Sequence, residues 1–252
     1  MQKAIVVIPA RYGSTRLPGK ALAEIEGRPL VQHVYDRARL ARLAADCVIA
    51  TDDVRIKQTC ESFGSKVVMT SPLHNSGTDR MAEVALNTGA DVYINVQGDE
   101  PLVDPEAIDL LIKTMFDDPS IKMGTLKRPF DSYDGFANPN LARIVCDKDD
   151  FALYFTRAAI PPMTREEFDT TDKRKLAFKH IGIYSFRRDF LLEFSKMPPS
   201  PLEKAERLEQ LRALEAGIKI KVLSTNYESV SVETPADLER VRALFAERRR
   251  GR

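Results

Sequence analysis

A chain of 252 residues is long enough to bury the core of one large α/β domain or two small ones. Its 38 basic and 37 acidic side chains give a formal net charge of +1, which excludes the positive excess typical of nucleic-acid-binding proteins. Cys47, Cys60 and Cys146 form no C-x-x-C pair, and the N-terminal apolar run is too short for a secretory leader or a membrane span. We therefore expect a protein of the reducing cytoplasm that binds neither nucleic acid nor membrane.

Apolar runs of strand length alternate with segments of helical period through the first half of the chain. The expected strands are 4–8, 47–51, 66–69 and 91–96, and the expected helices are about 30–43, 55–63, 79–88 and one that starts at Pro105. Repeated strand–helix units with short connections predict a mostly parallel sheet with helices on both faces, which is a three-layer α/β fold.

After Phe116 the rhythm changes, and irregular, proline-marked segments separate strand candidates at 123–127, 142–146 and 180–186. The charged segment 164–175 is typical of a mobile surface loop. We interpret this half as completing the same sheet and adding a small subdomain for a second substrate. No repeat or linker divides the chain, so a single domain over residues 1–252 is expected.

A helix is well marked near the end of the chain. Ser200 is expected to cap it in a capping box with Glu203, and Gly217 to stop it. On a helical wheel Glu209 and Arg212 project into an apolar stripe formed by Leu202, Ala205, Leu208 and Ala216. The two charged residues are either an ion pair at the edge of the stripe or part of a site, and the pattern leaves both interpretations open. Beyond this helix, the basic residues 248–250 and Arg252 are expected to form a solvated tail.

The loop after the first strand carries Arg11, Arg16 and Lys20, and this pattern indicates a phosphate cradle. It is not a P-loop, because five residues separate Gly13 from Gly19 and alanine follows the lysine. A merely solvated polar loop is the alternative.

Polar residues in several other segments are further candidates for a site. Asp99 follows the strand at 91–96 and is a natural magnesium anchor for a triphosphate, whereas the neighbouring Glu100 could be structural. The segment 76–80 caps a helix, binds a nucleotide, or does both. Asp53 is best explained as a helix cap, and a lone histidine such as His180 is more often structural than catalytic.

Eight segments occur in a specific order: IPARYGSTRLPGK, ATDD, SGTDR, NVQGDEP, ALYFTRAAIP, KHIGIY, PLEKAERLEQLR and VETPADLERVR. Through them nearly the whole chain resembles the 3-deoxy-manno-octulosonate (Kdo) cytidylyltransferase family. The resemblance implies a Rossmann-like, nucleotide-diphospho-sugar transferase fold and a homodimer. It also implies the reaction CTP + Kdo → CMP-Kdo + pyrophosphate, which activates the sugar for lipopolysaccharide synthesis. Residues 1–120 would then be mainly the CTP-binding half, 121–247 the sugar-binding and dimerisation half, and 248–252 the basic tail.

The resemblance also implies site residues. The catalytic set would be Asp99, Arg11 and Lys20, and the nucleotide would be bound by Arg11, Arg16, Lys20, Ser76, Gly77 and Gln97. The sugar acid would contact Gln97, Arg157, His180, Tyr184, Glu209 and Gln210, and Mg²⁺ would be held by Asp99 and Glu233.

Glu233 is a departure from the family pattern, which usually has aspartate before Thr-Pro. Because glutamate is one methylene longer, the metal would shift or a water would intervene. Three alternatives stay open: 8-amino-3,8-dideoxy-manno-octulosonate as the sugar, a sialic-acid cytidylyltransferase, and a non-catalytic nucleotide-binding regulator.

Overall fold

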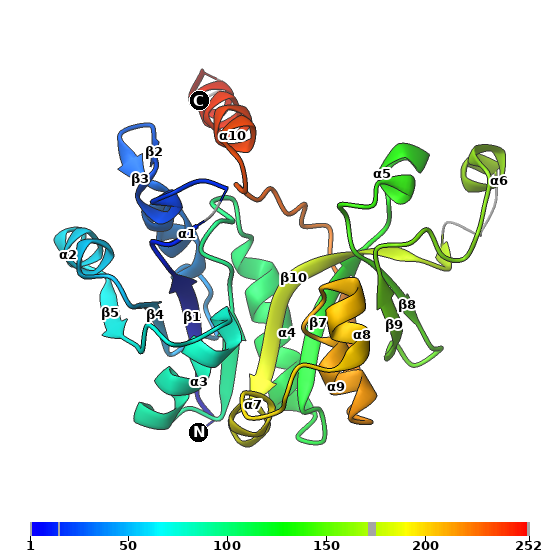
Figure 1. Ribbon diagram of the computed structural model, residues 1–252, viewed down its shortest axis with the longest axis horizontal. Helices are drawn as coiled ribbons and strands as arrows, with labels where there is room; N and C mark the ends of the chain where they lie inside the picture. The colour runs from blue at the N-terminus through cyan, green and yellow to red at the C-terminus, as the bar shows by residue number, and fades with distance from the viewer. Residues whose placement is uncertain (1, 15, 171–174, 251–252) are drawn as a thin grey trace.

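One mixed sheet runs through the computed structural model, which describes residues 2–14, 16–170 and 175–250. The strand order is β11-β7-β10-β6-β1-β4-β5, with β8 and β9 branching from β10 (Figure 1). The strands of the first half are β1 (Ala4–Ala10), β4 (Asp46–Thr51), β5 (Lys66–Met69) and β6 (Val92–Asn95). Those of the second half are β7 (Met123–Arg128), β8 (Arg143–Cys146), β9 (Ala152–Thr156), β10 (Phe178–Arg187) and β11 (Ile220–Ser224).

Strand β1 lies at the centre of the first half and pairs in parallel with both β4 and β6. Its apolar residues are buried on both faces: Val6 and Ile8 pack on one side and Val7 on the other. A strand that is apolar on both faces suits the interior of a parallel sheet, as the sequence predicted. Parallel pairing also brings the carboxyl ends of β1, β4 and β6 to one edge, where ligands bind in such sheets.

Helices cover both faces of the sheet, which confirms the three-layer prediction (Figure 1). Helices α1 (Leu30–Ala38), α2 (Val54–Ser62) and α4 (Pro105–Asp117) pack with Val6 and Ile8. Helices α3 (Gly77–Asn87), α7 (Arg188–Phe194) and α9 (Leu211–Glu215) pack with Val7.

Local sequence determines several element boundaries, and one boundary depends on a distant residue. Strand β5 and the start of α4 lie where they were predicted, and Asp53 caps α2 through the Arg55 amide. Helix α1, however, ends at Ala38 rather than near residue 43. The carboxylate of Asp109 on α4 accepts hydrogen bonds from the Arg42 amide at 3.0 Å and the Leu43 amide at 2.9 Å. These bonds stabilise a non-helical chain that the local pattern could not indicate.

The second half is joined to the first by β10, which runs antiparallel between β6 and β7. Strands β9 and β11 were not predicted. The segment predicted as a mobile loop instead contains helix α6 (Arg165–Thr170), and 171–174 lies outside the described residues. Thr164 and Glu167 hydrogen-bond to each other's backbone amides, and Phe168 packs on Phe136 of helix α5 (Tyr133–Ala137). These contacts explain why a charged segment is helical.

The predicted continuous helix between Ser200 and Gly217 is wrong. The capping box is present, and Gly217 has the expected positive φ, but the chain breaks into α8 (Pro201–Glu206) and α9, with Arg207 left-handed at φ 57°. Leu202 and Ala205 consequently lie exposed instead of on a buried stripe. Glu209 lies 3.7 Å from Arg212, the predicted ion pair, but Glu203 is the closer partner of Arg212 at 2.6 Å.

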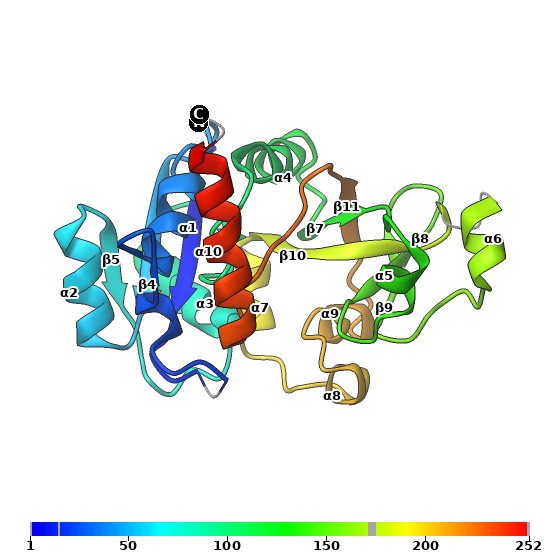
Figure 2. The ribbon, with the colours of Figure 1, turned by 90° about the horizontal axis from the view of Figure 1, so that it is seen from above.

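The C-terminal segment returns across the molecule. After β11 the chain passes over to the first half, where α10 (Pro235–Arg250) lies beside the hairpin of β2 (Glu24–Ile25) and β3 (Arg28–Pro29) (Figure 2). The basic residues 248–250, predicted as a tail, form the last helical turn, and Arg252 lies outside the described residues. Cys47, Cys60 and Cys146 are free thiols.

Among the described residues, every helix is too short or too polar to cross a membrane.

The left-handed conformation of Arg207 gives a test of the helix break. A β-carbon in this conformation costs free energy that glycine avoids, so Arg207→Gly should raise the free energy of unfolding by about 0.5–1 kcal/mol. The control is Lys204→Gly in the body of α8, which should lower it by about 1 kcal/mol. Urea denaturation of both variants measures the difference. Equal losses in the two variants would contradict a left-handed residue at 207.

Candidate active site

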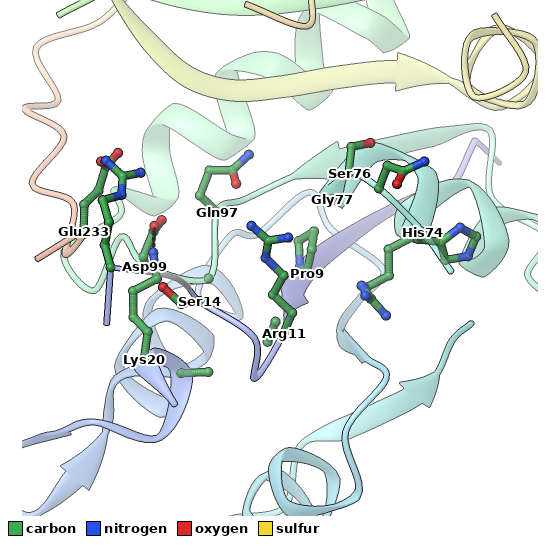
Figure 3. Close-up of a pocket in the computed structure, with 16 residues that line it drawn as sticks. Pro9, Arg11, Ser14, Lys20, His74, Ser76, Gly77, Gln97, Asp99 and Glu233 are labelled. Atoms are coloured by element: carbon green, nitrogen blue, oxygen red, sulfur yellow. Dashed lines mark hydrogen bonds and ion pairs between the residues drawn. The ribbon is translucent and has the colours of Figure 1, made fainter. Parts of the chain in front are cut away.

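A cleft opens at the carboxyl edge of the sheet, where β1 and β6 end and α3 begins (Figure 3). It brings together all the residues that were predicted to bind nucleotide or metal: Arg11, Arg16, Lys20, Ser76, Gly77, Gln97, Asp99 and Glu233. The cleft is also lined by Arg80, which belongs to the segment 76–80, and by residues for which the sequence predicted no role: Pro9, Ala10, Ser14, Ala21, His74, Asn75 and Gly98.

The loop after β1 folds back on itself and presents its cations to the cleft. The Tyr12 carbonyl accepts hydrogen bonds from the amides of Ser14 at 2.9 Å and Gly19 at 3.1 Å, which closes the loop. Gly19 has a φ of 68°, and the short 3₁₀ helix η1 (Lys20–Leu22) follows it. The Arg55 guanidinium lies 3.4 Å from the centre of the Tyr12 ring and holds the loop against α2. Lys20 thereby turns back into the cleft.

Two ion pairs connect the cationic loop to the acids on the other side of the cleft. Lys20 contacts Asp99, and Arg16 lies 2.5 Å from Glu233 (Figure 3). Asp99 can approach so closely because Gly98 passes against β1: a β-carbon at position 98 would lie 2.6 Å from the Pro9 carbonyl oxygen. Both acids therefore lie within reach of a ligand held by the loop.

Glu233 reaches the cleft because the C-terminal segment is anchored beside Asp99. The Val232 amide donates to the Asp99 carbonyl at 2.9 Å. Tyr227, earlier in the same segment, donates to the buried Glu100 carboxylate at 2.8 Å. Burial, together with the nearby charge of Asp99, raises the pKa of Glu100 to about 7. Glu100 thus has the structural role that the sequence left open, and it holds the segment that delivers Glu233.

The donor set of the cleft fits a divalent metal that arrives with phosphate ligands. The described residues contain no group of three or more His, Cys, Asp or Glu side chains able to hold a metal ion by themselves. Mg²⁺, however, is commonly bound by one or two carboxylates together with substrate phosphates. Asp99 and Glu233 lie side by side in the cleft and supply such carboxylates (Figure 3).

The opposite end of the cleft is built on the N-terminus of α3. Ser76 and Asp79 form a full capping box, so the helix-capping role expected of segment 76–80 is present. Arg80 is buried and pairs with Asp52 at 3.0 Å. The acid at the end of β4 and the arginine in the first turn of α3 were both visible in the sequence. Only the parallel sheet shows that they meet.

The predicted sugar-binding residues other than Gln97 do not line this cleft. They lie in a second region behind it, which β10 and the turn before α9 form next to β6 and α3. His180 and Tyr184 lie on β10 with ring centres 5.4 Å apart. Burial and the charge of Arg157 lower the pKa of His180. Burial and the charge of Glu209 raise the pKa of Tyr184. Glu209 is tied to the cleft wall because the Thr78 hydroxyl donates to it at 2.6 Å.

Three of the six buried side-chain atoms that have no hydrogen-bond partner among the described residues lie in this second region. The buried Oδ1 of Asn95, Oε1 of Glu209 and Nε2 of Gln210 have no hydrogen-bond partner. Asn95 pairs in register with Tyr184, and a β-carbon at Gly77 would lie 4.0 Å from its Nδ2. Leaving a buried polar atom unpaired costs about 1–3 kcal/mol, so such a cluster indicates a polar ligand. Asn95 was not among the predicted site residues, although it opens the NVQGDEP segment.

Arg157 is less free than the sequence suggested. Its Nε donates to the Glu206 carbonyl at 3.2 Å and its Nη1 to the Asn140 carbonyl at 2.9 Å. These bonds leave Nη2 to meet a ligand.

Comparison with known proteins agrees with this geometry. The Cytidylyltransferase family matches residues 5–220 of the chain. A 4-diphosphocytidyl-2C-methyl-D-erythritol synthase from Anaerococcus prevotii is 12% identical with a TM-score of 0.63 over 97% of this chain and 99% of its own, and shares the fold alone. The fold and the cleft define a nucleotidyltransferase.

Closer similarities narrow this class. A 3-deoxy-manno-octulosonate cytidylyltransferase of Geobacter sulfurreducens is 51% identical over 93% of this chain and 96% of its own length. One of Solibacter usitatus is 48% identical over 97% and 95%. The solved structure of CMP:2-keto-3-deoxy-manno-octonic acid synthetase complexed with CTP is 44% identical, with a TM-score of 0.91 over 98% of this chain and all of the other. This chain belongs to the 3-deoxy-manno-octulosonate cytidylyltransferase family.

The environment of His180 makes stability depend on pH. Burial, with the Arg157 charge, lowers the pKa of His180 from 6.5 to about 3. Between those values the unfolded chain binds a proton that the folded protein does not, so the free energy of unfolding falls as the pH decreases. Between pH 7 and pH 5, the titration of His180 should lower the free energy of unfolding by about 1–2 kcal/mol. Chemical denaturation of the parent protein and His180→Asn at pH 7 and pH 5 isolates this contribution, and an identical pH dependence in both would contradict it.

Proposed function

We propose that this chain transfers CMP from CTP to Kdo and releases pyrophosphate, and thereby activates the sugar for lipopolysaccharide synthesis. The observation that carries the proposal is the cleft, in which the cations Arg11, Arg16 and Lys20 lie opposite Asp99 and Glu233 in a member of this family. The names of the relatives favour Kdo over a sialic acid. Asp99 together with the cationic loop argues against a non-catalytic regulator.

The nucleotide would lie along the cleft. Guanidinium forks and a lysine match the charge of a triphosphate, so Arg11, Arg16 and Lys20 would hold the phosphates. Ser76 and Gly77, at the start of α3, would line the cytosine end, and Gln97 lies between the two ends (Figure 3). This arrangement would leave the α-phosphorus near Gln97 and Asp99, at the side of the cleft that faces β10.

The sugar acid would occupy the region behind the cleft. The residues proposed to contact it are Gln97, Arg157, His180, Tyr184, Glu209 and Gln210, and the unpartnered atoms of Glu209 and Gln210 support this. The Thr125 hydroxyl donates its single proton to a backbone carbonyl, that of Ile183 at 2.9 Å being the nearest. It must therefore accept at 2.9 Å from His180 Nε2. This tautomer leaves Nδ1 as an acceptor for a sugar hydroxyl.

The catalytic contribution of the chain would be positioning and charge compensation. The anomeric hydroxyl attacks the α-phosphorus in line and pyrophosphate leaves, so Arg11 and Lys20 would stabilise charge on the phosphates. Cytidylyltransferases of this type generally need a divalent metal, and we propose Mg²⁺ held by Asp99 and Glu233. Bound there, the metal would lower the pKa of the attacking hydroxyl and neutralise the leaving group. Lys20 and Arg16 would exchange their present carboxylate partners for phosphate oxygens.

The remaining proposals concern assembly and location. We propose a homodimer, and two observations support it: within the described part of the chain β9 pairs with β8 alone, and Leu153 on β9 is 62% exposed. Residues 1–120 would mainly bind CTP, and 121–247 would mainly bind the sugar and form the dimer. A cytoplasmic location without membrane or nucleic-acid partners fits the near-neutral net charge.

A panel of pyrophosphate-release assays tests the function. We expect release only when CTP, Mg²⁺ and Kdo are present together, because the cleft and the region behind it supply different substrates. The 8-amino sugar and a sialic acid serve as alternative acceptors, and each should react at least 10-fold more slowly than Kdo. Tight CTP binding without release of pyrophosphate from CTP in the presence of any of the sugars would instead support the regulatory alternative.

Glu233 should be essential although it is longer than the usual aspartate. Removing a metal-binding carboxylate in Glu233→Ala should lower kcat/KM by about 100-fold or more at fixed Mg²⁺. The matched control is Glu239→Ala on α10, where the carboxylate is exposed and pairs with Arg242 at 2.6 Å. Calorimetry of Mn²⁺ binding in the presence of CTP gives a second measurement. Near-normal activity in Glu233→Ala would remove Glu233 from the site.

A further inference from the structure

The break between α8 and α9 places the Glu206 carboxylate against the end of β9. One carboxylate oxygen accepts from the Thr156 hydroxyl at 2.6 Å and the Tyr154 hydroxyl at 3.4 Å, and the other accepts from the Arg157 amide at 2.9 Å. Both carboxylate oxygens thus accept hydrogen bonds, and the three donors come from residues 154–157 at the end of β9. Bonds to an ionised carboxylate are stronger than those between neutral groups. Glu206 itself lines no described cleft.

Arg157 is held by Glu206 at two points. Its amide donates to the Glu206 carboxylate, and its side-chain Nε donates to the Glu206 carbonyl at 3.2 Å. Arg143 fixes the next backbone group, because its Nη1 donates to the Arg157 carbonyl at 2.8 Å. The direction in which Arg157 presents its free Nη2 is therefore determined by Glu206 to a large extent.

Glu206 also lies at the point where the chain leaves helix α8. Arg207 directly follows it in the left-handed conformation, at φ 57°, and turns the chain away from α8. Two residues later, Glu209 reaches Thr78 at 2.6 Å, and Gln210 is buried with its Nε2 unpartnered. One carboxylate thus connects the element that carries Arg157 to the turn that carries Glu209 and Gln210.

We propose that Glu206 is a positioning residue for the sugar acid: it fixes Arg157 relative to the turn carrying Glu209 and Gln210. The inference rests on the proposed function, because the sugar is the ligand that these residues are assigned to meet. It assigns Glu206 no contact with the substrate. Its loss should weaken recognition of the sugar and leave the binding of CTP in the separate cleft unchanged.

Glu203 provides a matched control. It lies on the same helix and is also half-buried, and its carboxylate pairs with Arg212 at 2.6 and 2.8 Å. Arg212 in turn donates to the Met197 carbonyl at 3.2 Å, so this pair ties α8 to the end of α7. Arg212 also lies 3.7 Å from Glu209, but among the described residues Glu203 itself accepts no hydrogen bond from β9. If Glu206 had only a structural role, substitution of either glutamate would have the same effect on stability and on the KM for Kdo.

The test compares Glu206→Gln with Glu203→Gln. The glutamine has the same size, but its amide group would place a donor opposite the donors of Thr156 or Arg157. We expect Glu206→Gln to raise the KM for Kdo about 10-fold or more, with the Kd for CTP within about 2-fold of the parent. Glu203→Gln should lower the melting temperature, leave the Kd for CTP unchanged, and raise the KM for Kdo much less than Glu206→Gln does, because Glu203 reaches Glu209 only through Arg212. An unchanged KM for Kdo in Glu206→Gln, or an equal rise in both variants, overturns the proposal.

Hydrogen exchange separates this inference from the proposed function. Glu206→Gln should accelerate exchange of the Arg157 amide at least 10-fold, whereas Glu203→Gln should leave it unchanged. If the parent protein releases no pyrophosphate with Kdo, the proposed function fails, and the exchange result still decides whether Glu206 holds Arg157. Unchanged exchange in Glu206→Gln overturns the positioning role whatever the substrate.

Discussion

The parallel pairing of β1 with both β4 and β6 is the constraint on which the rest of the structure depends. It brings the ends of three strands to one edge, so Lys20 meets Asp99 and Arg80 meets Asp52, although the partners of each pair lie far apart in sequence. The pairing is stable because β1 buries apolar side chains on both faces. The close passage of Gly98 against Pro9 is a direct consequence, and no larger residue fits there.

The second organising feature is the return of the chain end to this edge. The buried bond between Tyr227 and Glu100 and the backbone bond from Val232 to Asp99 hold the returning segment in place. Burial of an acid is costly, and the raised pKa of Glu100 reflects that cost. As a result, Glu233 lies near Asp99, and the cleft contains a second carboxylate that comes from the opposite end of the sequence.

The predicted sugar-binding residues differ from those of the cleft in how they are organised. The cleft residues lie on the segments after β1 and β6, at the start of α3 and just before α10, and are open to a ligand. In contrast, His180, Tyr184 and Glu209 lie deeper, among groups left without hydrogen-bond partners. Their relative geometry depends on the α8–α9 break, and therefore on Glu206 and the left-handed Arg207. A helical wheel drawn over 200–217 could not show this, since the contacts that favour the break come from β9.

The sequence by itself determined the class of fold, the limits of β5, the start of α4, the caps at Asp53 and Ser76, and the identity of the cationic loop and Asp99. These features depend on hydrophobic period and on hydrogen bonds between residues a few positions apart. Only the tertiary structure decided the early end of α1, the break after Glu206, the pairing of Arg80 with Asp52 and the place of Glu233. Each of these features depends on a contact with a residue that lies tens to more than two hundred positions away in the sequence. The free energy of these contacts outweighs the local conformational preference of the chain.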